Sequence, residues 1–292
     1  MKHTGTELQK IRRAFANAIG KSFDRTNQFL GEISDEEVLP RRALIELLTT
    51  KMEKLRQDMS AQLTLLDTHH VGSARAMRRV CQENVFYMLM LSLGDPEHDL
   101  DSINIVQRHR PIKDWTRYKK QLADFLDLKD ELNMTASGVE AIEKSMTLVQ
   151  RQIVSLGNCP DIPAKLKHLV HRRFAEQILY ICKRLASRGM LDTAGLACAT
   201  SDYWFDCEAV HSGEASEWMY RPHDYGAEQD VNIELTALSL CQTLDGLFSL
   251  AIGSIVIAYG QSMNRPPEFI ELTNCANQIA DVLSQYSCSG AS

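Results

Sequence analysis

A mixture of cations and aromatic side chains between residues 108 and 120 is the segment best suited to hold an anion. Its members are Arg108, Arg110, Lys113, Trp115, Arg117, Tyr118, Lys119 and Lys120. Lys and Arg attract phosphate groups, and unpaired bases stack on Trp and Tyr. This pattern favours single-stranded nucleic acid as a partner. The same residues also fit a helix from Pro111 that turns Ile112, Trp115, Leu122 and Phe125 toward a core and its cations toward solvent.

A second basic patch lies on the helix that we expect to begin at Pro163. Its polar side carries Lys165, His168, Arg172 and Arg173. The two patches would form one anion-binding surface if their helices converge. The cations at the end of this helix, Lys183, Arg184 and Arg188, equally suit a helix C-terminus, where positive charge complements the backbone dipole.

The segment from residue 203 to residue 225 gathers aromatic side chains next to acids and histidines. Tyr203, Trp204, Trp218, Tyr220 and Tyr225 are candidates for a ligand-binding or partner-binding loop. Glu208 and His211 stand three residues apart and would share a helix face, which makes them weak candidates for a metal pair. A di-iron bundle needs a second Glu-x-x-His pair, and the chain has none. Ordinary packing of these side chains is the remaining interpretation.

Two His-Asp doublets suggest an alternative in which the chain is a metal-dependent hydrolase of an all-helical class. They are His98 with Asp99 and His223 with Asp224, and His69 or His70 would supply an earlier ligand for the first doublet. Both doublets stand in expected loops, where a helix does not fix ligand orientation. The chain also lacks a phosphate-binding glycine loop, a nucleophile elbow and a His-Glu-x-x-His helix. We therefore expect no cofactor, and a protein without enzymatic activity is favoured.

The helical period recurs along the whole chain, and no alternating stretch is long enough to predict a sheet. Leu8, Ile11, Phe15 and Ile19, for example, form one apolar face after a cap at Thr4 or Thr6. We expect an all-α, multi-helix bundle. Beyond this first helix, the expected helices cover about 40–67, 73–93, 111–131, 137–155, 163–188, 201–218, 232–260 and 266–287. The break at 157–163, with two prolines and a glycine, predicts two packed units, 1–158 and 163–292.

The most apolar run, Leu247–Tyr259, is shorter than the roughly 20 residues that a membrane-spanning helix needs. We expect a buried core helix near 232–260 and no integral membrane segment, with a homo-oligomer contact as the alternative. The eight cysteines form no close pairs, and the first 13 residues carry charges in place of an apolar leader. These features predict reduced thiols and a cytoplasmic protein.

Charge is distributed unevenly around a net value of −6. Residues 1–188 hold 30 of the 32 Lys and Arg and are net positive, whereas residues 189–292 are strongly acidic. The basic part could contact an anionic partner, the acidic part a basic protein, or the two could face each other inside the fold. We expect an interaction protein, an adaptor or assembly subunit with a protein partner and with nucleic acid as its leading anionic candidate.

Overall fold

The computed structural model describes residues 3–34, 39–93, 100–158, 161–162, 174–187, 189, 225–259 and 266–287. Within these residues every regular element is an α-helix and no strand occurs, which confirms the all-α prediction. The helices are α1 (Gly5–Ser34), α2 (Leu39–Asp67), α3 (Val71–Ser92), α4 (Leu100–Asp127), α5 (Ala136–Leu156), α7 (Phe174–Ser187), α10 (Gln229–Tyr259) and α11 (Pro267–Ser287).

The chain divides into two units that differ from the predicted ones. Residues 1–93 and 178–292 form the first unit, and residues 94–177 form the second. The predicted boundary, between units 1–158 and 163–292, therefore falls inside the second unit. The reason is that α10 and α11 pack on α1, so buried surface between distant helices defines the unit and the proline-rich break only ends α5.

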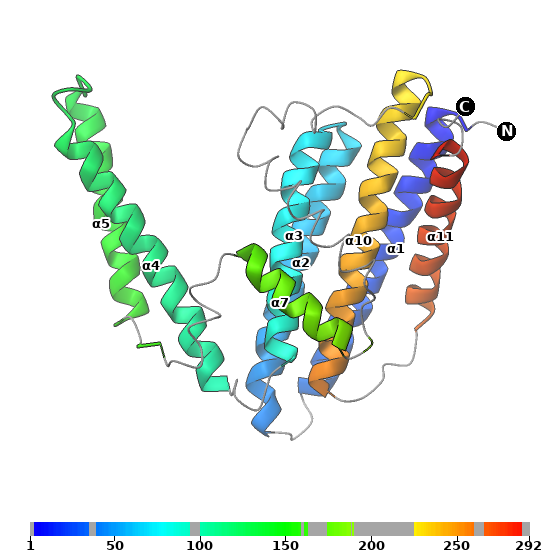
Figure 1. Ribbon diagram of the computed structural model, residues 1–292, viewed down its shortest axis with the longest axis horizontal. Helices are drawn as coiled ribbons and strands as arrows, with labels where there is room; N and C mark the ends of the chain where they lie inside the picture. Colours follow the sequence, from blue (N-terminus) through cyan, green and yellow to red (C-terminus); the bar gives the residue numbers. More distant parts are fainter. Residues whose placement is uncertain are drawn as a thin grey trace. The chain divides into compact units, whose positions relative to one another are not determined.

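Helix α10 is the centre of the first unit. It contacts α1, α2, α3 and α11, and the five helices run side by side (Figure 1). Its first buried stretch, from Glu234 to Leu238, is inaccessible on all sides of the helix. Phe248 packs edge-on against Phe23 of α1 and Phe269 of α11, with ring centroids 4.8 and 5.6 Å apart. Packing on four neighbours is what the sequence predicted for a core helix near 232–260.

Among the described helices, α10 also has the length and apolar composition of a membrane span, over Gln229–Ala258. These two properties do not distinguish a spanning helix from the core helix of a bundle. Packing on its four neighbours buries 44% of the most apolar window of this helix.

Helix α1 begins at a reciprocal cap. The backbone N–H of Thr4 donates to Glu7 Oε2 at 2.8 Å, and the N–H of Glu7 donates to the Thr4 hydroxyl at 3.4 Å, which is a capping box. The predicted apolar face is confirmed, since Leu8, Phe15 and Ile19 are at most 2% exposed. The amide of His3 donates to the Tyr286 hydroxyl at 3.0 Å and so fixes the start of α1 to the end of α11.

The turn between α2 and α3 lies earlier than predicted. Its backbone reverses at His69, whose φ is +60°, while Gly72 and Ser73 belong to the first turn of α3. The His70 N–H donates to the Leu65 carbonyl at 2.8 Å and the His69 N–H to the Leu66 carbonyl at 3.2 Å, which is the Schellman pattern. Histidine tolerates this left-handed conformation better than most residues. The turn between α2 and α3 therefore forms without a glycine at the reversal.

Helix α4 begins at Leu100 and continues through Pro111, although the sequence predicted a helix start at the proline. Ile105, His109 and Ile112 repeat at helical spacing across Pro111, and both His109 and Ile112 are buried. A continuous buried face therefore outweighs the hydrogen bond that the proline removes. Helix α5 follows as predicted, capped by the Thr135 hydroxyl, which accepts from the Gly138 N–H at 3.2 Å.

Only part of two further predicted helices can be compared. Residues 174–187 are helical, as predicted for 163–188, whereas residues 163–173 and the predicted helix at 201–218 lie outside the described residues.

The core position of α10 predicts the effect of a cavity in it. Leu238 is 0% exposed, so Leu238→Ala should lower the free energy of unfolding by about 2–5 kcal/mol. Ile270 on α11 is 52% exposed, and Ile270→Ala should change it by less than about 1 kcal/mol. Urea denaturation followed by circular dichroism measures both. Equal, small effects would show that α10 is not the core of this unit.

Candidate functional site

The basic and aromatic cluster predicted around residue 115 lies on α4. The side chains of Lys113, Trp115, Arg117, Tyr118 and Lys120 are exposed, and that of Lys119 is half-buried. Helices α4 and α5 form an antiparallel pair (Figure 1), joined by a hydrogen bond of 2.7 Å from Lys119 Nζ to Gln150 Oε1. The cations of Lys113, Arg117 and Lys120 are therefore accessible.

The two predicted aromatic side chains of this cluster lie next to each other. The rings of Trp115 and Tyr118 have centroids 6.3 Å apart at an angle of 57°, and they are 37% and 44% exposed. The two exposed rings stand one helical turn apart and next to cations. In proteins that bind single strands, such rings stack on bases and such cations neutralise phosphates.

Acidic side chains on the same hairpin oppose this basic character. Arg117 Nη2 lies 3.6 Å from Asp114 Oδ1, and four acids follow the cations along the chain. Those acids are Asp124, Asp127, Asp130 and Glu131. Residues 94–177, the second unit, hold 13 Lys and Arg and 13 Asp and Glu, so the unit has no net charge.

Ion pairs inside the first unit therefore neutralise part of the charge asymmetry of the chain. Arg12 and Lys21, both on α1, pair with Glu234 of α10 and Glu271 of α11 at 3.0 and 2.9 Å. Basic N-terminal helices and acidic C-terminal helices face each other there, which was one of the three interpretations of the sequence.

Several predicted site residues lie outside what the structure describes. These are the side chains of Arg108 and Arg110 and all of Lys165, His168, Arg172, Arg173, Tyr203, Trp204, Glu208, His211, Trp218 and Tyr220. Tyr225 is described and half-buried. Its N–H donates to Asn232 Oδ1 at 2.9 Å, and burial raises the pKa of its hydroxyl. This tyrosine lies in the short segment that leads into the start of α10.

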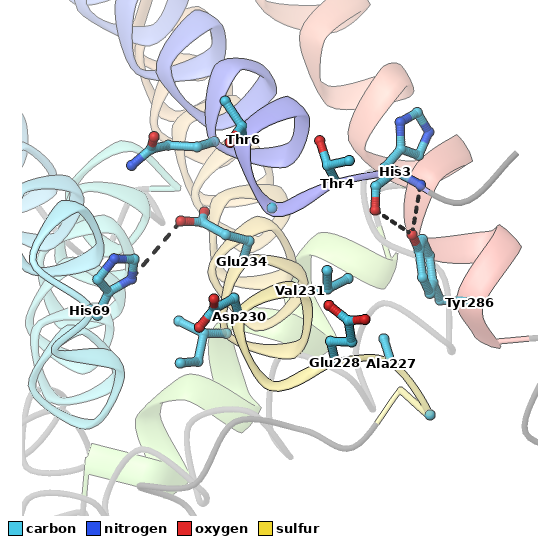
Figure 2. A pocket seen from close by; sticks show the side chains of 14 residues that line it. His3, Thr4, Thr6, His69, Ala227, Glu228, Asp230, Val231, Glu234 and Tyr286 are labelled. Carbon is cyan, nitrogen blue, oxygen red and sulfur yellow. Dashed lines mark hydrogen bonds and ion pairs between the residues drawn. The ribbon is translucent and has the colours of Figure 1, made fainter.

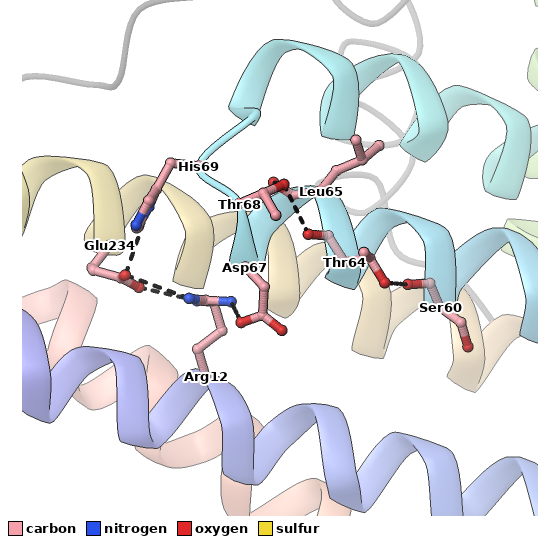
Figure 3. Close-up of polar contacts among 8 residues, drawn as sticks. All are labelled: Arg12, Ser60, Thr64, Leu65, Asp67, Thr68, His69 and Glu234. Atoms are coloured by element: carbon pink, nitrogen blue, oxygen red, sulfur yellow. Dashed lines mark hydrogen bonds and ion pairs between the residues drawn. The ribbon is translucent and has the colours of Figure 1, made fainter.

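A polar group that the sequence did not single out lies at one end of the first unit. Arg12, 1% exposed, donates from Nε to Glu234 Oε2 at 3.0 Å and from Nη2 to Glu234 Oε1 at 3.4 Å, and its Nη1 donates to Asp67 (Figure 3). Glu234 is only 4% exposed. The imidazole Nδ1 of His69 lies 3.9 Å from the same carboxylate. One guanidinium thus joins α1, α2 and α10.

These charges depend on one another electrostatically. Burial lowers the pKa of Arg12, but its hydrogen bonds and ion pairs with Glu234 and Asp67 outweigh burial and hold that pKa above the ordinary value. A guanidinium also stays charged at every physiological pH. Two features of the sequence could have revealed the pair: a cation on the buried face of α1, and an acid in the apolar helix α10.

A cavity of about 950 Å³ opens next to this network (Figure 2). The starts of α1 and α10 and the ends of α2 and α11 form its wall. Its polar lining includes His3, Thr4, His69, Asp230, Glu234 and Tyr286. The volume suits a small molecule. The described part of the chain contains no group of three or more His, Cys, Asp or Glu side chains placed to hold a metal ion.

Burial affects the thiols of the described cysteines. Cys81, Cys182, Cys241 and Cys275 form no disulfide within the described part of the chain, in line with the prediction of reduced thiols. Burial raises the pKa of Cys182 to about 11 and that of Cys241 to about 12, so both stay protonated at neutral pH.

Comparison with known proteins gives no family for the chain. No protein-family model matches it, and no curated protein and no solved structure shows significant similarity to it. Its function is therefore inferred from its own residues.

The buried Arg12–Glu234 pair predicts a large mutational effect. Arg12→Met leaves a buried carboxylate without its cation and should lower the free energy of unfolding by about 3–5 kcal/mol. Replacing both partners, Arg12→Met with Glu234→Met, should recover most of this loss, because no charge then stays buried. Urea denaturation measures the difference.

Lys21→Met is the matched control for Arg12→Met. It removes an exposed pair on the same helix, with side chains 56% and 46% exposed, and should change stability by less than about 1 kcal/mol. Equal effects of Arg12→Met and Lys21→Met would contradict a structural role for the buried pair.

The carboxyl group of Asp245 on α10 predicts that the stability of the fold depends on pH. Burial raises the pKa of its carboxyl to about 6 from an ordinary 3.8. The folded chain therefore binds this proton more tightly than the unfolded chain, and the contribution of Asp245 to stability declines as pH rises from about 4 to about 6. Asp245→Asn should raise the unfolding midpoint more at pH 7 than at pH 4, whereas Asp281→Asn, on the exposed side of α11, should not show this difference. Thermal unfolding at the two pH values measures it.

Proposed function

We propose that the protein is a non-enzymatic helical interaction protein, an adaptor or assembly subunit, that binds its partner through the α4–α5 hairpin. One observation supports this proposal above all: large exposed apolar side chains are concentrated on the hairpin. They are Trp115, Tyr118, Phe125, Leu128, Leu132, Leu148 and Val154. In the rest of the described chain such side chains are Val80, Leu179 and Ile270, which are scattered. Grouped exposed apolar side chains are typical of interaction surfaces.

The first unit supports this function as a folded body. Its core is closed around α10, and its buried polar network joins three helices. An adaptor needs such a folded body in the same chain as its binding surface.

Nucleic acid is the candidate anionic partner for residues 113–120 of α4. The adjacent rings of Trp115 and Tyr118 and the exposed cations Lys113, Arg117 and Lys120 support contact with a single strand. The alternative function, a metal-dependent hydrolase, is not supported by any group of described residues. Of its candidate ligands, His69 is described and lies beside Glu234, whereas His98, Asp99, Glu208, His211 and His223 lie outside the described residues.

A fluorescent polythymidine strand tests the nucleic acid contact on the full chain. Arg117→Glu with Lys120→Glu should weaken binding about tenfold or more at low salt and reduce its salt dependence, because fewer counterions are released. Trp115→Ala with Tyr118→Ala should weaken it by about 1–3 kcal/mol per stacked base. Fluorescence anisotropy measures both.

The control for charge is Lys144→Glu with Arg151→Glu on α5, where Lys144 is 73% exposed and pairs with Glu140. This variant should bind as the unmodified chain does. Strand binding that is equal in all variants would exclude the α4 surface as the nucleic acid site.

A further inference from the structure

Six charged side chains form a row on α4, on the side away from α5. In chain order they are Lys113, Arg117, Lys120, Asp124, Asp127 and Glu131. Spacings of four and three alternate, so these residues share one helix face. All six are exposed, whereas Leu122, on the opposite side of the helix, is buried. Glu131 lies just beyond α4, where the Leu132 N–H still donates to the Leu128 carbonyl at 2.9 Å and continues the helical path.

The row is divided by sign into three cations followed by three anions. Neighbours in the row are therefore like charges, apart from Lys120 and Asp124 at its centre. Like charges at this spacing repel and weaken an isolated helix. Apart from the exposed ion pair of Arg117 with Asp114, the row is unfavourable within one chain, and it becomes favourable when a row of opposite polarity lies against it.

A second copy of the same helix, running antiparallel, provides that opposite row. When residue i of one copy lies opposite residue 244 − i of the other, the pairs are Lys113 with Glu131, Arg117 with Asp127, and Lys120 with Asp124. Two-fold symmetry produces each pair twice. We infer that this face of α4 is a homodimer interface in which two copies of the chain pair antiparallel, an inference that rests on the proposed role of the α4–α5 hairpin in binding.

Apolar side chains at the edge of the row complete the surface. Phe125 and Leu128 are 52% and 41% exposed and lie on one side of the charged row. In the dimer both copies contribute these side chains, whose burial supplies affinity, while the charge pairs set direction and register. The second unit has no net charge, so two copies of it approach without overall repulsion.

A nucleic acid strand fits only half of this row. The cations Lys113, Arg117 and Lys120 would meet phosphates, but Asp124, Asp127 and Glu131 on the same face would repel the continuing strand. A second copy of the chain offers opposite charges to both the cations and the anions of the row. The row therefore favours self-association over binding of nucleic acid along its whole length.

Sedimentation equilibrium of the full chain tests the dimer. We expect a mass twice the 33.0 kDa of one chain at micromolar concentration, and weaker association at high salt because the pairs are exposed. Two variants reverse the row, one with Lys113→Glu, Arg117→Glu and Lys120→Glu, the other with Asp124→Lys, Asp127→Lys and Glu131→Lys. Each alone should raise the dimer dissociation constant about tenfold or more, because like charges then face each other.

Mixing the two variants in equal amounts should restore a dimer, since each now carries a uniformly charged row opposite in sign to the other. Recovery on mixing requires that both variants are folded, and circular dichroism of each alone provides a separate check. Lys144→Glu with Arg151→Glu on α5 should leave the dimer unchanged. A monomeric parent chain, or a mixture that stays monomeric while both variants retain their helix content, would overturn the inference.

The outcomes also separate this inference from the proposed function. If the chain is monomeric and Arg117→Glu with Lys120→Glu abolishes strand binding, the hairpin binds nucleic acid and only the homodimer is excluded. A different outcome would exclude both the homodimer and the proposed function. It is that neither Phe125→Ser with Leu128→Ser nor the charge variants change strand binding or self-association, although the chain stays folded.

Discussion

The buried guanidinium of Arg12 is the interaction on which the first unit depends. A charged group at this depth is stable only when its partners are placed around it, and those partners come from two other helices, Glu234 on α10 and Asp67 at the end of α2. A one-residue shift of any of these helices would turn a partner away. The pair thus restricts the rotation and register of three helices whose apolar contacts alone would tolerate sliding.

The left-handed backbone at His69 belongs to the same constraint. The Schellman turn ends α2 directly after Asp67, so the carboxylate reaches Arg12 and the imidazole faces Glu234. A longer α2 would carry Asp67 into the middle of a helix and move the turn away from α10. The local turn geometry and the distant ion pair are therefore parts of one arrangement at the end of the bundle that holds the cavity.

Sequence patterns predicted the parts of the fold that depend on local spacing. The apolar face of α1 and the core character of α10 follow from residues close together in the chain, and the structure confirms them. The unit boundary, the α2–α3 turn and the start of α4 did not follow, because distant packing decides them. In the candidate site, the exposed cluster on α4 was predicted from its composition. The Arg12 network was missed because its two principal members stand 222 residues apart.

This separation along the chain affects the order in which the protein is made. Helices α1, α2 and α3 leave the ribosome first, yet the central helix on which they pack begins only at Gln229. Until then their apolar faces and Arg12 have no partner from α10, whereas α4 and α5, adjacent in sequence, can pair as soon as both emerge. The first unit can close only after α10 has been synthesised, so the apolar faces of α1, α2 and α3 lack their central partner while residues 93–228 are made.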